Sequence, residues 1–184
     1  DLVVMAVPSH GFRAVLRRAR PWLPPAAPVI SVTKGIEQGS LKRMTEIVLE
    51  ETGRDPGAVG VLTGPNLARE IAAGQPAATV VATPDPAPAL AVQALFMGPT
   101  LRVYTNPDVV GCEAAGALKN VMAIAAGMAH GLGYGDNSTA ALITRALAEL
   151  TRLGVAMGGR PLTFAGLAGM GDLVATCISA QSRN

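Results

Sequence analysis

The sequence is poor in the residue types on which several classes of protein depend. Its only cysteines, Cys112 and Cys177, have no partners at a metal-binding spacing, so neither a disulfide framework nor a zinc site is expected. Aromatic residues make up 3% of the chain and the formal net charge is +2, which argues against a nucleic-acid-binding surface. The sequence therefore predicts a protein of a reducing, cytoplasmic compartment that binds neither a metal ion nor nucleic acid.

Long apolar runs and a basic leader segment are also missing. No uninterrupted apolar run reaches the roughly 20 residues that span a membrane, so no membrane span is expected. The chain is nevertheless 49% hydrophobic over 184 residues, enough for the core of one large or two modest domains. Residues 2–7 have the pattern of a buried parallel strand, which needs neighbours on both sides. We therefore expect this sequence to be part of a longer protein.

The first part of the chain alternates short runs rich in β-branched residues with amphipathic segments. Strands are expected at residues 2–7, 29–32, 60–63, 78–82 and 101–104. Helices are expected after Ser9 and at residues 40–51, 67–72 and 86–97. The alternation predicts an α/β fold in which residues 1–107 form the C-terminal part of a Rossmann-type, doubly wound sheet.

Strand signals stop after Pro107, and apolar residues then recur at helical spacing. Long helices are expected at residues 109–128 and 138–157. Two glycine-rich segments, at 131–135 and 166–171, follow no strand and are therefore interpreted as turns between helices rather than nucleotide-binding loops. Residues 108–184 are thus expected to form an all-α substrate domain that is incomplete at its C-terminal end.

The helix expected at residues 109–128 is apolar on nearly every face, yet it carries Lys119 and Asn120. Burying an unpaired ammonium is costly, so Lys119 either has a functional partner or extends its side chain to the surface. Only three of the fifteen basic residues are lysines. Lysine can transfer a proton where arginine cannot, which favours a chemical role without settling the choice.

Three of the expected strands end in short turns that contain proline, glycine or polar residues, at 8–9, 33–35 and 64–66. The carboxyl ends of parallel strands meet at one edge of a sheet and form the ligand crevice there. Lys34 would place a cation at its rim and favour an anionic ligand. An ordinary surface lysine is the alternative, and Asp172 is similarly either a site carboxylate or a helix cap.

Six sequence motifs occur in a characteristic order along the whole chain. They are Val-Thr-Lys34-Gly35, Thr-Gly64-Pro-Asn-Leu-Ala68-Arg-Glu70, Gly116-Ala-Leu-Lys119-Asn120-Val, His-Gly-Leu-Gly-Tyr-Gly135-Asp-Asn, Gly169-Met-Gly-Asp172-Leu-Val-Ala-Thr176-Cys and Gln-Ser-Arg183-Asn184. With these motifs the chain resembles the bacterial-type NAD(P)-dependent glycerol-3-phosphate dehydrogenases. The resemblance implies that a glycine-rich dinucleotide loop precedes this sequence and that further helices follow it.

The resemblance also implies an activity and a setting. The reaction is a reversible hydride transfer between NAD(P)H and dihydroxyacetone phosphate that gives sn-glycerol 3-phosphate for phospholipid synthesis. The implied cofactor is NAD or NADP, the implied substrate is a small phosphate compound, and a homodimer is among the expected assemblies.

The family's site residues can be placed on matching positions of this sequence. Lys119 corresponds to the proton donor and acceptor at the C2 oxygen of the substrate. Substrate contacts are implied for Lys34, Gly64, Asn66, Lys119, Asn120, Asp172, Thr176, Ser182, Arg183 and Asn184. Cofactor contacts are implied for Pro8, Lys34, Ala68 and Arg183. Asn66 stands where bacterial members commonly have Ser or Thr, which keeps the role but changes the contact.

Two other functions remain open at this point. The chain fits another two-domain dehydrogenase of the same superfamily, acting on a hydroxy acid or a sugar acid. It also fits a nucleotide-binding fragment without catalysis, because fold alone does not determine function.

Overall fold

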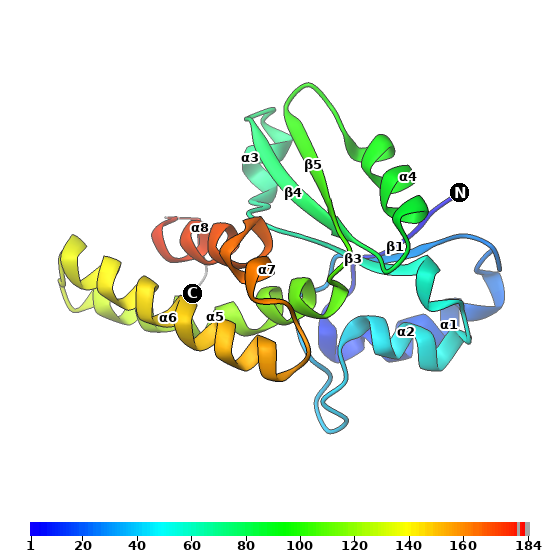
Figure 1. Cartoon of the computed structure of the whole chain (residues 1–184), viewed down its shortest axis with the longest axis horizontal. Coiled ribbons are helices and arrows are strands. Elements are labelled where there is room, and N and C mark those ends of the chain that lie inside the picture. Colours follow the sequence, from blue (N-terminus) through cyan, green and yellow to red (C-terminus); the bar gives the residue numbers. More distant parts are fainter. Residues whose placement is uncertain (180, 183–184) are drawn as a thin grey trace.

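The computed structural model describes residues 1–179 and 181–182, and it consists of a five-stranded sheet followed by a group of helices (Figure 1). The strands are β1 (Val3–Met5), β2 (Val29–Ser31), β3 (Val59–Thr63), β4 (Ala77–Ala82) and β5 (Leu101–Asn106). The helices among and after them are α1 (Phe12–Ala19), α2 (Met44–Thr52), α3 (Ala68–Ala72), α4 (Pro86–Phe96), α5 (Val109–Gly131), α6 (Asp136–Ala156), α7 (Pro161–Ala165) and α8 (Asp172–Ile178). Short 3₁₀ turns are η1 (Ser9–Gly11), η2 (Arg20–Trp22) and η3 (Pro56–Ala58), and η4 (Leu167–Gly171) is a π-helical turn. The predicted α/β class, with a Rossmann-type sheet before an all-helical part, is confirmed.

The strands lie side by side in sequence order, from β1 to β5. The β1–β2, β2–β3 and β4–β5 pairs are parallel, as a doubly wound sheet requires, whereas β3 and β4 are antiparallel. The connection between β3 and β4 holds only the five-residue α3, and Gly74, with a φ of 72°, turns the chain back after it. The carboxyl ends of β1, β2 and β3 therefore meet at one edge of the sheet, and that edge carries the site.

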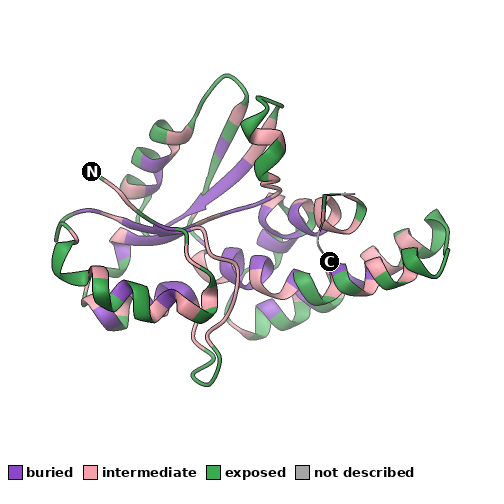
Figure 2. Cartoon of the chain, turned by 180° about the vertical axis from the view of Figure 1, so that it is seen from behind, coloured by how far each residue is buried: buried purple, intermediate pink, exposed green. Residues whose placement is uncertain are grey.

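Helices cover both faces of the sheet (Figure 2). Val29 of β2 packs with Phe12 of α1 and Ile47 of α2, whereas its neighbour Ile30 packs with Val92 of α4 on the opposite face. This alternation is the period-two pattern of a strand that is buried on both sides.

The helix predicted from residue 40 begins at Met44 instead. Leu41 has a left-handed φ of 57°, which no α-helix allows. Ile36 pairs with Arg43 in an isolated antiparallel bridge, so the chain makes a narrow loop between them. Arg43, the residue before the helix, then forms its capping box.

α5 and α6 form a long antiparallel pair that extends away from the sheet (Figure 1). Leu150 of α6 and Phe164 of α7 pack against Ala115 of α5, and the glycine-rich segment at 131–135 is the turn that was predicted. Burial on nearly every face of α5 was predicted, and this was wrong for its C-terminal half, where Val121 and Met128 are exposed. No other described segment covers that side of the helix.

α5 is also long and apolar enough to cross a membrane by length and composition. Half of the most apolar stretch of α5 is buried inside the protein, and the first turns of the helix pack against β3 and η4. α5 therefore contacts both the sheet and the other helices, and η4 also packs against β4, so both elements join the two parts of the chain.

Candidate functional site

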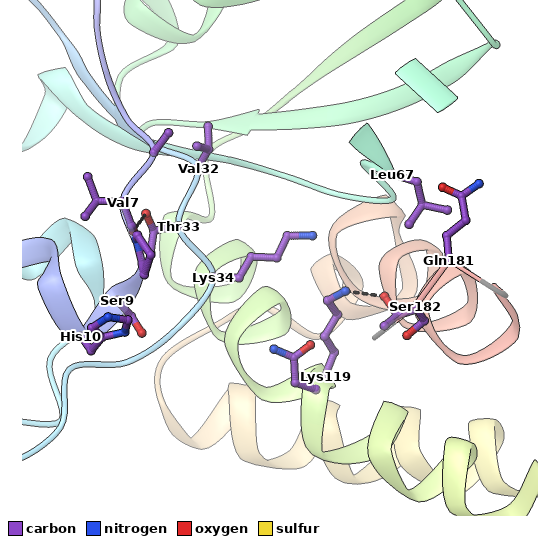
Figure 3. A pocket seen from close by; sticks show the side chains of 14 residues that line it. Val7, Ser9, His10, Val32, Thr33, Lys34, Leu67, Lys119, Gln181 and Ser182 are labelled. Atoms are coloured by element: carbon purple, nitrogen blue, oxygen red, sulfur yellow. Dashed lines mark hydrogen bonds between the residues drawn. The ribbon is translucent and has the colours of Figure 1, made fainter. Parts of the chain in front are cut away.

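A cavity of about 790 Å³ opens at the carboxyl ends of β1 and β2 (Figure 3). Two walls come from the sheet edge, at residues 6–10 and 32–34. The other lining residues come from the residue before α3, from α5, and from α8 and the segment after it: Leu67, Lys119, Asn120, Thr176, Gln181 and Ser182. The cavity therefore lies between the sheet edge and the helices. Two of the three predicted strand-end turns, at 8–9 and 33–35, contribute to it, whereas the turn at 64–66 does not line it.

Lys119 lies at this cavity with its side chain almost completely enclosed, at 7% exposure. Its Nζ is 2.8 Å from Oδ1 of Asp172 and donates a second hydrogen bond to Oγ1 of Thr176. The Thr176 hydroxyl in turn donates to the backbone oxygen of Asp172 at 2.7 Å, one turn back in α8. The idea that Lys119 extends to the surface is therefore wrong: its ammonium is buried and held by a carboxylate and a hydroxyl.

Asp172 also holds a second ammonium. Nζ of Lys34 lies 2.5 Å from Oδ2 of Asp172 and donates to the backbone oxygen of Gly64 at 3.0 Å. Burial lowers the pKa of Lys34 and the nearby Lys119 ammonium adds to this, against the opposing effect of Asp172. Asp172 is thus a site carboxylate as well as the first residue of α8, and Lys34 is not an ordinary surface lysine.

Two ammoniums on one carboxylate leave a net positive charge at the cavity. Figure 3 shows the side chains of Lys34 and Lys119 extending toward the same region from different elements. In a partly enclosed cavity such a charge attracts an anionic ligand more strongly than at an open surface. The arrangement can bind an anion and can deliver a proton from an enclosed ammonium.

A glycine on α5 allows the lysines to come this close. A Cβ on Gly116 would lie 3.0 Å from Oγ1 of Thr63, at the end of β3, and 3.5 Å from Cγ of Lys34. The stem of Lys34 therefore crosses α5 one turn before Lys119. A Cβ at residue 116 would therefore require the Thr63 side chain to shift by a few tenths of an ångström in this closely packed region.

Two predicted residues lie in a second cavity of about 490 Å³, which shares Val32 and Lys34 with the first. Asn66 and Ala68 line this second cavity and do not line the cavity of Lys119. Asn66 donates from Nδ2 to Oγ1 of Thr79 at 3.0 Å, while its buried Oδ1 has no partner among the described residues. The predicted residues are thus divided between two cavities on either side of Lys34.

The remaining predicted residues are placed as follows. Pro8, Asn120 and Ser182 line the larger cavity, and Gly64 contributes its backbone oxygen to Lys34. Arg183 and Asn184 lie outside the described residues. Among the described residues, no group of three or more His, Cys, Asp or Glu side chains could hold a metal ion.

Sequence reasoning missed six lining residues: Ala6, Val7, His10, Val32, Leu67 and Gln181. Gln181 donates from Nε2 to Oε1 of Glu70 at 3.2 Å, which links the segment after α8 to α3. His10 and Leu67 directly follow strand-end turns, so their position in the sequence could have indicated them. Gln181 belongs to the motif Gln-Ser-Arg183-Asn184, but no local signal indicates its contact, which joins residues 111 positions apart.

The two cysteines have no role at this site. Burial raises the pKa of Cys112 to about 12 and also raises the pKa of Cys177, so both are kept as thiols. Both cysteines are free in the structure.

Comparison with known proteins gives consistent matches along the chain. Residues 1–89 match the family model "NAD-dependent glycerol-3-phosphate dehydrogenase N-terminus", and residues 108–184 match the corresponding C-terminus model. The chain is 61% identical over its full length to glycerol-3-phosphate dehydrogenase [NAD(P)+] 2 of Sphingopyxis alaskensis, and 57% identical to the glycerol-3-phosphate dehydrogenase [NAD(P)+] of a Parafrankia species. It covers 55% of each of these relatives, so it spans about half their length.

Solved structures agree with these matches. The glycerol-3-phosphate dehydrogenase of Coxiella burnetii superposes with a TM-score of 0.91 at 41% identity, over 99% of this chain and 55% of that one. The enzyme of Saccharomyces cerevisiae superposes with a TM-score of 0.86 at 30% identity, over 98% of this chain and 54% of that one.

Proposed function

The chain belongs to the NAD-dependent glycerol-3-phosphate dehydrogenase family, and on that premise we propose that it carries the acid/base lysine and much of the substrate site of such an enzyme. The proposed reaction is reversible hydride transfer between NAD(P)H and dihydroxyacetone phosphate, giving sn-glycerol 3-phosphate. The observation that carries this proposal is the buried Lys119 ammonium, held by Asp172 at a positively charged cavity.

Two features of the cavity support the binding of a nicotinamide nucleotide. It lies at the carboxyl ends of parallel strands, where Rossmann-type sheets bind dinucleotides, and its volume of about 790 Å³ is large enough for part of one. The strand-end turn at Pro8 and the ammonium of Lys34 would contact it, with Ala68 and Arg183 as further proposed contacts. When bound, the nucleotide supplies or accepts the hydride.

Lys119 is proposed to move the proton that accompanies the hydride. Reduction of a carbonyl places negative charge on its oxygen, and a preorganised ammonium both stabilises that charge and donates the proton to it. In the reverse direction the neutral amine takes the proton from the C2 hydroxyl. Asp172 and Thr176 accept hydrogen bonds from Lys119 and so fix the direction of its Nζ.

Substrate binding is assigned to the positive charge and the polar groups around Lys119. Lys34 provides a second ammonium for an anionic substrate. Gly64, Asn120, Asp172, Thr176 and Ser182 are the proposed neighbouring contacts, with Arg183 and Asn184 suited to the phosphate. Asn66 would reach the substrate from the second cavity, which shares Lys34 with the first. The unpartnered Oδ1 of Asn66 supports this assignment, because a buried acceptor without a donor favours a ligand that supplies one.

The first test is NADH and NADPH oxidation by the full-length protein with dihydroxyacetone phosphate, ketopantoate or 3-oxo acids offered separately. We expect turnover with dihydroxyacetone phosphate. A preference for either of the other compounds would favour the alternative dehydrogenase, and no turnover with any of them would favour a non-catalytic nucleotide-binding protein.

The second test is substitution of the lysine. Lys119→Ala should lower kcat by at least about 100-fold while cofactor binding is retained, because the general acid is lost. Lys119→Arg should not restore kcat, because arginine keeps its proton. Lys42 lies in the loop between β2 and α2 and pairs with Glu50, so Lys42→Ala is the matched control. This variant should have a normal kcat. Near-normal rates in either Lys119 variant would contradict the assignment.

Further features of the whole protein belong to the same proposal. Residues 1–107 would act as the nucleotide-binding domain and residues 108–184 as the substrate domain. The free thiols support a reducing, cytoplasmic location. A homodimer and a role in phospholipid synthesis are the remaining expectations.

A further inference from the structure

The first half of α5 carries one charged residue besides Lys119. It is Glu113, whose side chain is 5% exposed. It does not line either cavity described above. Helix geometry places residues 113 and 119 about 120° apart around α5, so Glu113 faces α2 while Lys119 faces α8. A buried carboxylate without a role in the proposed reaction therefore lies six residues from the proposed catalytic lysine.

Three donors from the start of α2 satisfy this carboxylate. Oε1 of Glu113 accepts from the backbone N of Thr45 at 2.9 Å, and Oε2 accepts from Nη1 of Arg43 at 2.8 Å and from the Thr45 hydroxyl. Burial raises the pKa of Glu113, against the lowering effect of these hydrogen bonds. Breaking a buried, charge-assisted pair of this kind by removing one partner is strongly unfavourable.

The cluster does more than cap α2. The capping box of that helix is already complete within its own segment, since Glu46 accepts from the backbone N of Arg43 at 2.8 Å. Glu113 comes from α5, 68 residues away from Thr45 in the sequence. Its hydrogen bonds therefore tie one element to another.

The contacts of Glu113 with Arg43 connect to Lys34 through the loop between β2 and α2. Arg43 pairs with Ile36 in the bridge that closes the base of the loop after β2, and Glu37 N donates to Lys42 O at 2.9 Å beside it. Ile36 is two residues from Lys34, whose Nζ meets Asp172. The contacts thus form a closed ring that starts at Glu113 of α5, passes through Arg43, Ile36, Lys34 and Asp172, and returns to α5 at Lys119.

We propose that Glu113 is a positioning residue, which holds the loop after β2 against α5 and thereby fixes Lys34 beside Lys119. The proposal rests on the function proposed above, because it assigns Glu113 to the geometry of that site. Without these contacts the loop base loses its hydrogen bonds to α5, and Lys34 is kept beside Lys119 only by its own contacts with Asp172, Gly64 and Gly116.

The test is a double-mutant cycle in the full-length protein, with rates normalised to folded protein by near-ultraviolet circular dichroism. Glu113→Gln keeps the shape of the side chain but removes its charge. We expect kcat/KM for dihydroxyacetone phosphate to fall about 10- to 100-fold, the size of effect that misplacement of a site group produces. Lys34→Met should also reduce kcat/KM. The double variant should be at most about threefold worse than the poorer single variant, because both changes disable the same lysine.

A second cycle, Arg43→Gln with Lys34→Met, keeps the test valid if Glu113→Gln does not fold. Arg43→Gln removes the same ion pair from its other partner, and the change is milder because the Arg43 side chain is 17% exposed. Glu46 pairs with the same Arg43 but does not contact α5. Glu46→Gln is therefore the matched control and should leave kcat/KM unchanged. Losses that multiply in both cycles would overturn the proposal, since a merely structural Glu113 would not couple to Lys34.

Amide hydrogen exchange provides a readout that does not depend on turnover. Glu113→Gln should speed exchange both at the start of α2 and at residues 33–37, and faster exchange confined to α2 would overturn the proposal. If the unmodified protein fails to reduce dihydroxyacetone phosphate, the proposed function fails, whereas faster exchange at residues 33–37 would still support the tie between Glu113 and Lys34.

Discussion

Replacing Asp172 by Asn tests whether one carboxylate stabilises two enclosed ammoniums. The Asp172 side chain is 3% exposed, and it lies 2.8 Å from Nζ of Lys119 and 2.5 Å from Nζ of Lys34. The asparagine keeps the volume and can still accept one hydrogen bond, but the local charge rises from one positive unit to two. The variant therefore isolates the charge of the carboxylate from its shape.

The expected loss of stability follows from the exposure of the two lysines. Removing one partner of a buried ion pair costs about 3–5 kcal/mol. The Lys119 side chain is 7% exposed and cannot recover hydration, whereas Lys34 is 26% exposed and recovers part of it. Only the Asp172–Lys119 pair is therefore counted in full, so the free energy of unfolding should fall by about 3 kcal/mol. With a urea m-value of about 2 kcal/mol/M, the unfolding midpoint at pH 7 should fall by about 1.5 M.

The pH dependence gives a second, independent check. Burial already holds the pKa of Lys34 below its usual 10.5, and Asp172 is the main group that opposes this. In Asp172→Asn the pKa of Lys34 falls further, so between that pKa and 10.5 the unfolded state binds more protons than the folded state. The free energy of unfolding then rises with pH, and the defect should be smaller near pH 10 than at pH 7.

Glu149 offers a matched control, because it also pairs with two cations, Arg145 and Arg152, but lies at the surface of α6. Glu149→Gln should move the midpoint very little, since solvent screens exposed pairs. The measurement is urea unfolding of the full-length protein at pH 7 and pH 10. A loss below about 1 kcal/mol for Asp172→Asn, or a loss that is equal at both pH values, would refute the reasoning.

Two further predictions concern stability away from the site. Arg13 binds Glu37 through two hydrogen bonds and is the main cause that holds the pKa of Glu37 at about 2, so the stability from this pair is present above the usual value of 4.5 and is lost as pH falls toward 2. Glu37→Gln should therefore flatten the fall of the urea midpoint across that range, and an unchanged slope would contradict the assignment. Gly154→Ala would place a Cβ 2.0 Å from Cζ of the buried Phe164, so it should lower the free energy of unfolding by about 1–3 kcal/mol in thermal melts. An unaltered melting temperature would show that the ring has room to shift.

The course of the elements could be predicted because it depends on local pattern. Apolar residues that alternate or recur at helical spacing identified all five strands and the long helices, with ends displaced by a few residues. The start of α2 was misplaced because Leu41 takes a left-handed conformation that its residue type does not indicate. The direction of β4 was missed because strand pairing depends on how the chain returns after α3, which periodicity does not report.

The candidate site was only partly predictable for a related reason. Lys119 was identified because a charge in an apolar helix is a local anomaly. Glu113 lies in the same helix, but its partners Arg43 and Thr45 follow a loop whose shape the sequence does not reveal. Asn66 and Ala68 are close to Gly64 in the sequence, yet they line a different cavity from Lys119, because Lys34 crosses between the two.

The sequence by itself determined that an α/β sheet precedes a helical part, and that an isolated lysine lies on the first long helix after the sheet. Only the tertiary structure decided what that lysine does with its charge. Its carboxylate partner Asp172 is 53 residues away, and the same carboxylate reaches Lys34 across 138 residues. Local sequence patterns indicate whether a side chain is buried or exposed. The partner that compensates the free-energy cost of burying a charge depends instead on how distant elements pack together.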